Sequence, residues 1–281
     1  MNRINLFFSL TVFLSIITIS CNKSDEFENI QDAGIRGKFL VDKIYDYHNN
    51  LLAEYFYDSD NKLIKKAVTD HLIEPNRTID RKWEDTFEYK NERVSKIKTY
   101  NLYIDNSPIT GFTQESNTET AFEYDSQGKP KQEGSDFLYE NGKLVSTYGY
   151  SFGKYFYRDS IVYNNSMNVS KHIYTGPEYT MFEEPISGTY RVTTHYYEYD
   201  DKPKPNFGLD YLFVYNPFPY TGGADLERSL SKNNMTRAEG EGYEWIYTYN
   251  ENGLPATIET KWIGIEISEP MLMRITYKQI R

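Results

Sequence analysis

The sequence predicts an all-β protein, an antiparallel meander of aromatic-rich hairpins that forms one large curled or barrel-like sheet. Aromatic residues recur two positions apart and are followed by turn-forming residues, whereas apolar residues at helical spacing are nearly absent after residue 35. Tyrosine, phenylalanine and tryptophan make up 16% of the chain, so aromatic side chains have to supply much of the core. No linker-like tract divides the pattern, which predicts a single domain over residues 35–281.

Five hairpin units carry the pattern. In the first, Tyr55 and Tyr57 share one face of a strand because side chains alternate, and the polar run that follows forms a turn. Asp, Asn and Gly suit such turns, since they tolerate a positive φ or cap the backbone with their side chains. The units span Tyr55–Leu63, Phe87–Val94, Phe122–Pro130, Phe137–Leu144 and Tyr247–Pro255.

Three long connections interrupt the units, at Asp70–Lys82, Asp105–Thr118 and Asp201–Gly242. The last is rich in proline and glycine, and we expect a short helical piece within it near Asp225–Leu230. Long loops in compact domains are often functional, so these three segments are the predicted binding surfaces.

The N-terminus has the order of a secretory signal peptide over residues 1–20: Arg3, an uncharged apolar run, and the small residue Ser20. Cys21 follows directly, which predicts a bacterial lipoprotein signal with acylation, including palmitate, at this thiol. Two alternatives stay open. Thr18, Ile19 and Ser20 also fit an ordinary signal peptidase site, and the run also resembles a transmembrane helix, although spanning takes about 20 apolar residues.

Residues 21–34 are polar and acidic, which predicts a flexible tether between lipid and fold. The same tract resembles the Lys- and acid-rich stretches that send Bacteroidota lipoproteins to the cell surface. We therefore expect a protein that is lipid-anchored in the outer membrane and faces either the periplasm or the exterior.

Composition excludes several classes of function. The formal net charge of −10 argues against nucleic acid, which requires a basic surface. Cys21 is the only cysteine, so disulfides are not expected to stabilise the fold, and no pattern predicts a cofactor or a metal. No second apolar run follows the signal, so we expect membrane contact through the anchor alone.

The aromatic-Asp-Gly units resemble YD repeats, the building blocks of rearrangement-hotspot and teneurin β-shells. Residues 196–260 also resemble an uncharacterised Bacteroidota lipoprotein family, a domain of unknown function with a porin-like β-fold. The likeness rests on Tyr197–Phe207, on Ser231–Asn234, and on Tyr247, Tyr249, Gly253 and Pro255. Asn-Pro-Phe of that family is scrambled here to Pro205-Asn206-Phe207. The resemblance implies location and fold and carries over no catalytic residue.

The sequence predicts few individual residues to be functional. Gly149-Tyr150-Ser151-Phe152-Gly153 matches the nucleophile elbow of hydrolases, but aromatic strand patterns flank it, so we interpret it as a turn or bulge between strands. Ser160 lies in an Asp-Ser-Ile triplet that resembles a Bacteroidota O-glycosylation acceptor. The candidates for stacking against a sugar ring are Trp83, Trp245 and Trp262.

The leading hypothesis is a non-catalytic lipoprotein whose sheet binds an outer-membrane protein partner or a glycan at the envelope. The alternative is a glycan-directed hydrolase whose carboxylates are brought together by the fold. A structural shell fragment is a third hypothesis, by analogy with YD-repeat proteins. A deep cleft lined by Asp, Glu and Trp would favour the hydrolase.

Overall fold

The computed structural model describes residues 35–74, 76–131, 135–151, 155–179, 185–219, 223–264 and 271–280. The signal peptide and tether over residues 1–34, including Cys21, therefore lie outside the described residues. Within the described part, none of the helices has the length and apolar character needed to span a bilayer.

Fifteen antiparallel strands form one curled sheet that does not close, so the predicted single meander is confirmed. The N-terminal half contributes the 3-10 helix η3 (Ile35–Lys38) and the strands β1 (Phe39–Tyr45), β2 (Leu51–Tyr57), β3 (Leu63–Glu74), β4 (Arg77–Lys90), β5 (Arg93–Asp105) and β6 (Phe112–Ala121). A separate two-stranded hairpin follows, β7 (Glu123–Tyr124) and β8 (Pro130–Lys131).

The remaining strands are β9 (Ser135–Glu140), β10 (Lys143–Ser151), β11 (Tyr155–Tyr163), β12 (Val169–Tyr179), β13 (Pro185–Pro203), β14 (Asn233–Ala238), β15 (Tyr243–Tyr249), β16 (Pro255–Trp262) and β17 (Met271–Gln279). The helix α1 (Asp225–Leu230) precedes β14 and the 3-10 helix η4 (Glu239–Glu241) follows it. Each strand of the sheet pairs with its neighbours in sequence, β1 pairs with β17, and β6 and β9 are the two edges.

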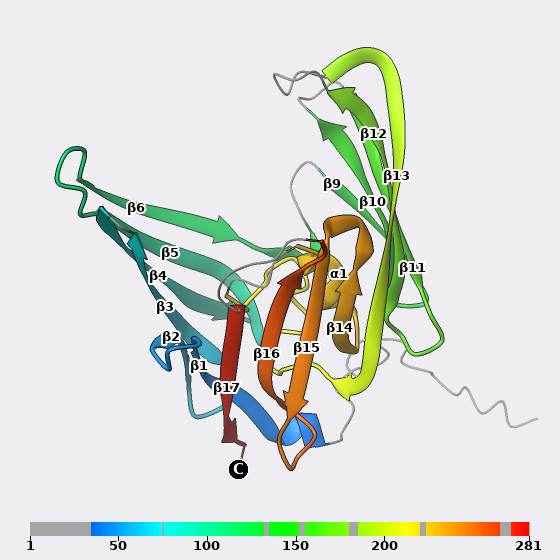
Figure 1. Ribbon diagram of the computed structural model, residues 1–281. Coiled ribbons are helices and arrows are strands. Elements are labelled where there is room, and N and C mark those ends of the chain that lie inside the picture. The colour runs from blue at the N-terminus through cyan, green and yellow to red at the C-terminus, as the bar shows by residue number, and fades with distance from the viewer. Residues whose placement is uncertain are drawn as a thin grey trace, which may run out of the picture.

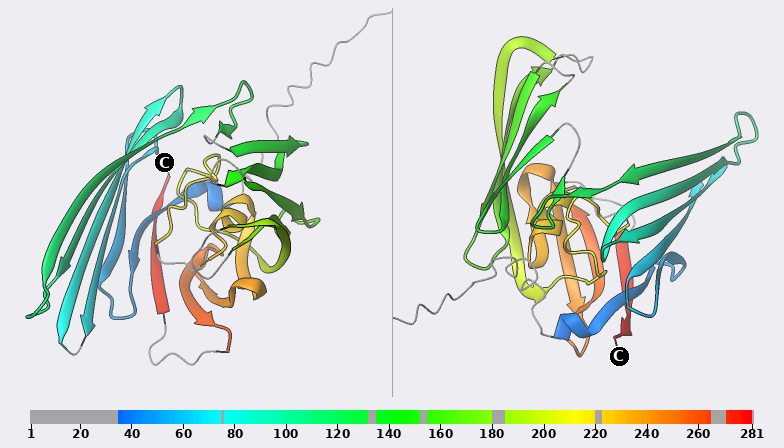
Figure 2. Two further views of the ribbon diagram at one scale, coloured as in Figure 1. Left: turned by 90° about the horizontal axis from the view of Figure 1, so that it is seen from above. Right: turned by 180° about the vertical axis from the view of Figure 1, so that it is seen from behind.

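Two groups of strands diverge from the centre of the molecule (Figure 1). We call β3–β6 the first wing and β9–β13 the second wing. The chain between β13 and β14, residues 204–219 and 223–230, is called the inner segment. Seen from above, this segment lies between the two wings on the concave side of the sheet (Figure 2).

The core forms where the inner segment packs into the curl. Its apolar side chains meet buried residues of both wings and of the central strands. Leu212 is fully buried, and Phe207 lies 5.0 Å from Tyr55 between ring centroids. Burying one such side chain contributes about 1.5–3 kcal/mol. The inner-segment residues in the core are Phe207, Leu209, Leu212, Phe213, Phe218, Ala224 and Leu230.

Five turns share one geometry that explains the Asp and Asn of the hairpin units. The first residue accepts from the backbone N–H of the fourth and donates to the carbonyl of the fifth, as in Asp58 to Lys62. The Asp58 carboxylate also accepts from the N–H groups of Asp60 and Lys62, both at 2.9 Å. The fourth residue has a positive φ, 63° at Asn61. The other four turns are 46–50, 125–129, 164–168 and 250–254.

Tyrosine hydroxyls close the hairpins at their open ends. Each donates to a backbone carbonyl near the start of a neighbouring strand, at distances of 2.7–3.2 Å. Their rings meanwhile pack against the core, which explains how a chain with 27 tyrosines buries so much aromatic surface. The tyrosines, with the carbonyls that accept, are Tyr57 (Val41), Tyr89 (Leu63), Tyr124 (Val94), Tyr139 (Pro130), Tyr163 (Leu144), Tyr247 (Met235) and Tyr277 (Pro255).

The predicted connections contain the expected helix, but strand residues occupy part of all three; in Asp201–Gly242 these are the end of β13 and the whole of β14. The helix expected near Asp225–Leu230 is α1, with those same bounds. Asp70–Lys82 is not a loop, because β3 continues to Glu74 and β4 begins at Arg77, and these two residues pair with each other. The segment Asp105–Thr118 is a loop only over residues 106–111, after which β6 begins. Asp70–Lys82 and Asp105–Thr118 both belong to the first wing.

Replacing Tyr163 by Phe removes the hydroxyl that donates to the Leu144 carbonyl at 3.0 Å and keeps the ring. We expect the free energy of unfolding to fall by about 0.5–1.5 kcal/mol in urea denaturation. Tyr47→Phe is the matched control, because Tyr47 is 54% exposed, and it should leave the midpoint unchanged. Equal midpoints for both variants would contradict a structural role for these hydroxyls.

Candidate functional site

A cleft of about 450 Å³ opens between the inner face of the second wing and the inner segment. Its volume is within the about 300–1,000 Å³ of small-molecule sites. Aromatic rings and short polar side chains line it together. The second wing contributes Phe137, Thr147, Tyr157 and Asp159. The inner segment contributes Phe213, Val214 and Asn216 and, from its helix α1, Asp225 and Leu226.

Strand register positions the wing side of this cleft. Phe137, Thr147 and Asp159 pair in one row across β9, β10 and β11, so their side chains point to the same face. Tyr157 pairs with Gly149, whose missing side chain leaves room beside the ring. The ring of Phe213 packs against that of Phe137, with centroids 5.8 Å apart, so the inner segment and the second wing are in contact at this side of the cleft.

A histidine held by two carboxylates adjoins the cleft through Asp159, which lines it. The Nε2 atom of His172 lies 2.8 Å from Oδ1 of Asp159, and its Nδ1 atom lies 2.5 Å from Oε1 of Glu227. Thr147 donates to the second oxygen of Asp159 at 2.9 Å. Burial opposes protonation of His172, but the hydrogen bonds that its ring donates to both carboxylates, and the carboxylate charges, outweigh burial and raise its pKa to about 9. At neutral pH the ring is therefore an imidazolium.

We call Asp159, His172 and Glu227 the ion triad. Tyr197 and Glu241 extend its polar network. The Tyr197 hydroxyl donates to Oε1 of Glu241 at 3.3 Å. Burial, together with the charge of Glu227, raises the pKa of Glu241 above its ordinary value. His195 pairs with His172 across β12 and β13, with ring centroids 6.4 Å apart. Among the described residues, no group of three or more His, Cys, Asp or Glu side chains has an arrangement suited to a metal ion.

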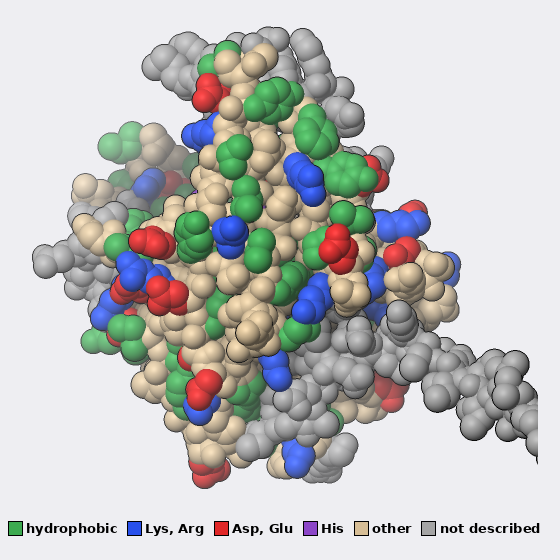
Figure 3. Space-filling view, turned by 90° about the vertical axis from the view of Figure 1, so that its right-hand side faces the viewer, with side chains coloured by type: hydrophobic (Ala, Val, Ile, Leu, Met, Phe, Trp, Pro, Cys, Tyr) green, Lys and Arg blue, Asp and Glu red, His purple; other side chains and the backbone are tan. Residues whose placement is uncertain are grey.

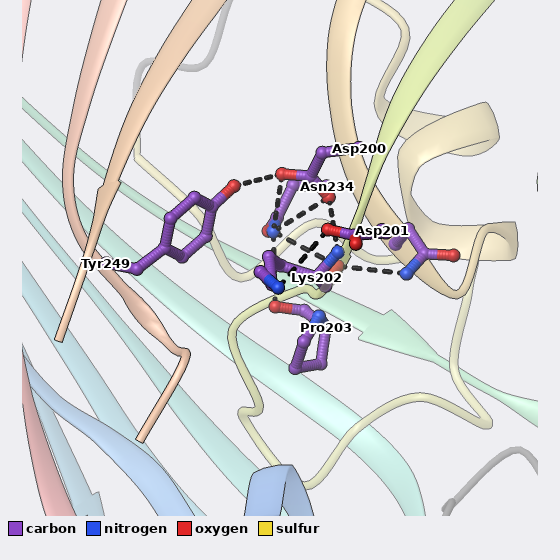
Figure 4. A network of polar contacts seen from close by, with 7 residues as sticks. Asp200, Asp201, Lys202, Pro203, Asn234 and Tyr249 are labelled. Atoms are coloured by element: carbon purple, nitrogen blue, oxygen red, sulfur yellow. Dashed lines mark hydrogen bonds and ion pairs between the residues drawn. The ribbon is translucent and has the colours of Figure 1, made fainter. Parts of the chain in front are cut away.

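The motif residues of 196–260 meet elsewhere, in a structural network at the end of β13 (Figure 4). Asn234 is buried, and its amide donates to the Asp200 carboxylate and to the carbonyls of Lys202 and Pro203, the last two at 3.2 Å. Tyr249 donates to the same carboxylate. These contacts fix the end of β13 against β14 and β15, so the motif holds the fold together and does not line the cleft.

A second buried network fastens the inner segment to the first wing. Lys66 and Asp85 form an ion pair at 2.8 Å, and both are almost fully buried. The Tyr215 hydroxyl of the inner segment donates to the same carboxylate at 2.5 Å, and Thr99 donates to its other oxygen at 2.6 Å. Burial works against charging Asp85, but Lys66 and these donors lower its pKa overall.

A smaller cavity of about 60 Å³ lies between the inner segment and the central strands, where Leu212, Met235 and Ile258 are among the residues that line it. It is much smaller than the about 300–1,000 Å³ of small-molecule sites, so the cleft is the better candidate for ligand binding.

The structure places the predicted site residues away from the cleft. Trp245 is buried beneath the guanidinium of Arg228, 4.2 Å from the ring centroid, and Trp83 is partly buried against the core. Trp262 is 40% exposed at the end of β16. Ser160 lies within β11, paired with Ser146 and Ile173, and its glycosylation stays a prediction.

The hydrolase-like motif is part of a hairpin. Gly149–Ser151 end β10, Ser151 pairs with Tyr155, and β11 follows where the nucleophile elbow requires a helix. Residues 152–154 lie outside the described part. The dispersed histidines gave no signal for the ion triad, because Asp159, His172 and Glu227 meet only through strand pairing and the return of the inner segment.

No protein-family model matches the chain, and no curated protein is similar to it at a significant level. Solved structures that are similar to it include two porin-like proteins. A porin-like protein from Bacteroides uniformis ATCC 8492 has 10% identity and a TM-score of 0.37, with 76% of this chain and 96% of that one covered. A porin-like protein from Bacteroides vulgatus ATCC 8482 has 14% identity and a TM-score of 0.37, covering 86% of this chain and 100% of that one. At this distance neither assigns a function.

The ion triad predicts a loss of stability at alkaline pH. His172 has a pKa of about 9 in the folded protein and about 6.5 when unfolded, so its contribution is complete below about pH 6.5 and is lost as the pH rises through 9. We expect the free energy of unfolding to fall by about 1–2 kcal/mol between pH 7 and 9.5, after allowance for solvent screening. Urea denaturation across this pH range measures it.

His172→Gln should flatten that alkaline decline. His71→Gln is the matched control, because His71 faces Asp80 at 2.5 Å in an exposed pair, and it should leave the pH profile as it is. An unchanged slope in His172→Gln would contradict the charged triad.

Proposed function

We propose that this protein is a lipid-anchored envelope protein that binds an oligosaccharide in the cleft without transforming it. The observation that carries the proposal is the lining of the cleft, where the partly exposed rings of Phe137 and Tyr157 lie beside the polar groups of Thr147 and Asp159. Aromatic faces stack on the apolar faces of sugar rings, and carboxylates accept hydrogen bonds from sugar hydroxyls.

The hydrogen bonding of the carboxylates supports binding over hydrolysis. One oxygen of Asp159 accepts from Thr147 and the other faces His172, so the side chain is fixed in place. Asp225 accepts from the Asn216 amide at 2.7 Å. Each carboxylate oxygen keeps capacity for a further hydrogen bond, which suits a sugar hydroxyl. A glycosidase acid or nucleophile instead has to face the scissile bond.

The proposed envelope location rests on Cys21 and on the signal-like residues that precede it. Two or three acyl chains on its thiol and amino group hold a protein stably at a bilayer, where one chain is marginal. We expect the mature protein to sit in the outer membrane, on either side of it.

Anchoring is tested by labelling cells with a palmitate analogue and by mass spectrometry of the mature N-terminus. The wild-type chain should incorporate label and begin at an acylated Cys21, and Cys21→Ala should incorporate none and keep residues 1–20. An unmodified Cys21 at the mature terminus would support ordinary signal peptidase cleavage and would remove the anchor from the proposal.

Sugar binding is tested on an array of envelope and host glycans, followed by calorimetry with the best ligand. Tyr157→Ala removes an aromatic face from the cleft and should weaken binding about tenfold or more, equivalent to about 1.4 kcal/mol. Trp262→Ala removes an exposed ring outside the cleft and should leave the dissociation constant unchanged. The reverse pattern would move the site to Trp262, and no binding by the wild type would overturn the proposal.

Hydrolysis is the second candidate, because Asp159 and Asp225 line the same cleft. It predicts release of reducing sugar from the array ligand, abolished by Asp159→Asn or by Asp225→Asn. The binding proposal predicts recovery of the ligand intact.

A further inference from the structure

The edge strand β6 has one side of its backbone open. Within the described part of the chain, β6 pairs with β5 alone and forms one of the two edges of the sheet, at the margin of the first wing (Figure 1). All ten of its residues, Phe112–Ala121, are exposed. The N–H and C=O groups on the open side can therefore pair with a further strand, and an edge of this kind is a template for another chain.

Several features that protect edge strands are missing from β6. Natural edges are often short, interrupted by a bulge, or marked by proline and lysine. β6 has ten residues with neither proline nor lysine, and its register with β5 is unbroken from Phe112 to Ala121. The opposite edge, β9, has six residues. β6 is therefore the longer edge of the sheet and carries fewer of these protections.

Acidic side chains on the outer side of β6 favour a basic partner strand. Glu115 and Glu119 are four residues apart and so point to the same side. The lysines on this side of β5 are each paired with a glutamate, Lys96 with Glu119 at 2.7 Å and Lys98 with Glu88 at 2.5 Å. They also lie one strand further from the open side. A cation directly across from each glutamate of β6 would form a favourable cross-strand pair.

On the inner side, a stack of planar groups ends at the open side of β6. Arg81 lies on the same side of β4 as Asp85, which contacts the inner segment. The Cζ atom of Arg81 is 5.6 Å from the ring centroid of Tyr103, and Tyr103 stacks on Phe112 with centroids 5.4 Å apart. Phe112 ends this stack and is 51% exposed. An aromatic side chain on an added strand would continue the stack.

The strands that this protein itself offers are acidic where β6 is acidic. Asp136 and Glu140 of β9 are also four residues apart, so pairing β6 of one copy with β9 of another can set carboxylates against carboxylates. Two antiparallel copies of β6 centred on Asn117 would set Glu115 against Glu119. The tether is acidic as well. These charges favour a strand from a different, basic protein segment.

Exposed apolar side chains elsewhere do not identify a partner. On the second wing, Tyr190, Val192 and Tyr196 are more than half exposed. Hydrophobic side chains on this side of the molecule are interspersed with both basic and acidic ones (Figure 3). That surface therefore has no charge pattern that selects an occupant, whereas β6 combines an open backbone with defined side-chain rows.

We infer that the open side of β6 accepts an extended strand of a second protein in antiparallel pairing. The backbone of that strand supplies hydrogen bonds, its basic residues lie opposite Glu115 and Glu119, and an aromatic residue lies opposite Phe112. From its N-terminus the strand therefore has a basic residue, three residues of any type, a second basic residue, two residues of any type and an aromatic residue. This interface does not depend on the proposed sugar binding or on the lipid anchor.

A synthetic peptide of the same length as β6 tests the inference. It has lysine at the third and seventh positions, tyrosine at the tenth and threonine elsewhere. Added to the full chain, it should slow amide hydrogen exchange in residues 112–121 at least about tenfold and leave exchange in residues 135–140 unchanged. No slowing in residues 112–121 at saturating peptide would contradict the inference.

Two N-methylated versions of the peptide separate strand pairing from charge attraction. One version carries the methyl groups on odd-numbered amides and the other on even-numbered amides. Only one version should lose binding, because alternate amides of a strand face a given neighbour. Equal affinity of the two versions would overturn the inference, since attraction of lysine to an acidic chain does not depend on which amides are methylated.

Glu115→Lys should weaken binding of the lysine peptide at least about threefold and strengthen binding of a peptide with glutamate in place of lysine. Glu140→Lys is the matched control, because it makes the same change of charge at the other edge, on β9, and it should leave both affinities unchanged. Equal effects of the two variants would argue against pairing at β6, since binding would then follow net charge alone.

Hydrogen exchange without peptide tests the other occupants. Protection of residues 112–121 that grows with protein concentration would identify a second copy as the occupant. Protection that is lost when residues 22–34 are deleted would identify the tether. Either result would replace the second protein of this inference.

Discussion

Burial of the inner segment in the curl of the sheet is the constraint on which the rest of the structure depends. A single layer of fifteen strands has no opposing sheet to cover its concave side, and a sheet has to bury one face against another element. The inner segment supplies that element through Phe207, Leu212 and Phe213. The buried pair of Lys66 and Asp85 adds specificity, because removing one charge would leave the other unpaired in the interior. The inner segment, held in this position, also forms one wall of the cleft.

Local chemistry made the hairpins predictable. A positive φ at the fourth turn position and the side-chain caps of Asp58 and its counterparts depend on residues a few positions apart, so the printed sequence contains all that is needed. The first wing was harder to predict. Residues 112–121 of β6 are exposed on both faces, so no apolar alternation marks that strand, and the adjoining charged residues of β3 and β4 resemble a loop in composition.

The candidate site could not be predicted from the sequence, because its residues meet through register and tertiary return. Asp159 and His172 come together only when β11 and β12 pair in one particular alignment, and Glu227 arrives from α1. The helix itself was predictable, but the strand that it would face was not.

The pairing of β1 with β17 has a consequence for how the chain reaches its final form. The strands follow one another around the sheet, yet the seam between the first and last described strands lies inside the sheet, and its edges fall at β6 and β9. During synthesis, β1 is complete long before its partner β17, and until then it has a row of unsatisfied backbone groups on that side. A chaperone that shields an extended strand would protect it in this interval. A circular permutant opened between β6 and β9, with Gln279 joined to Phe39, would meet every partner in sequence order and fold without that delay.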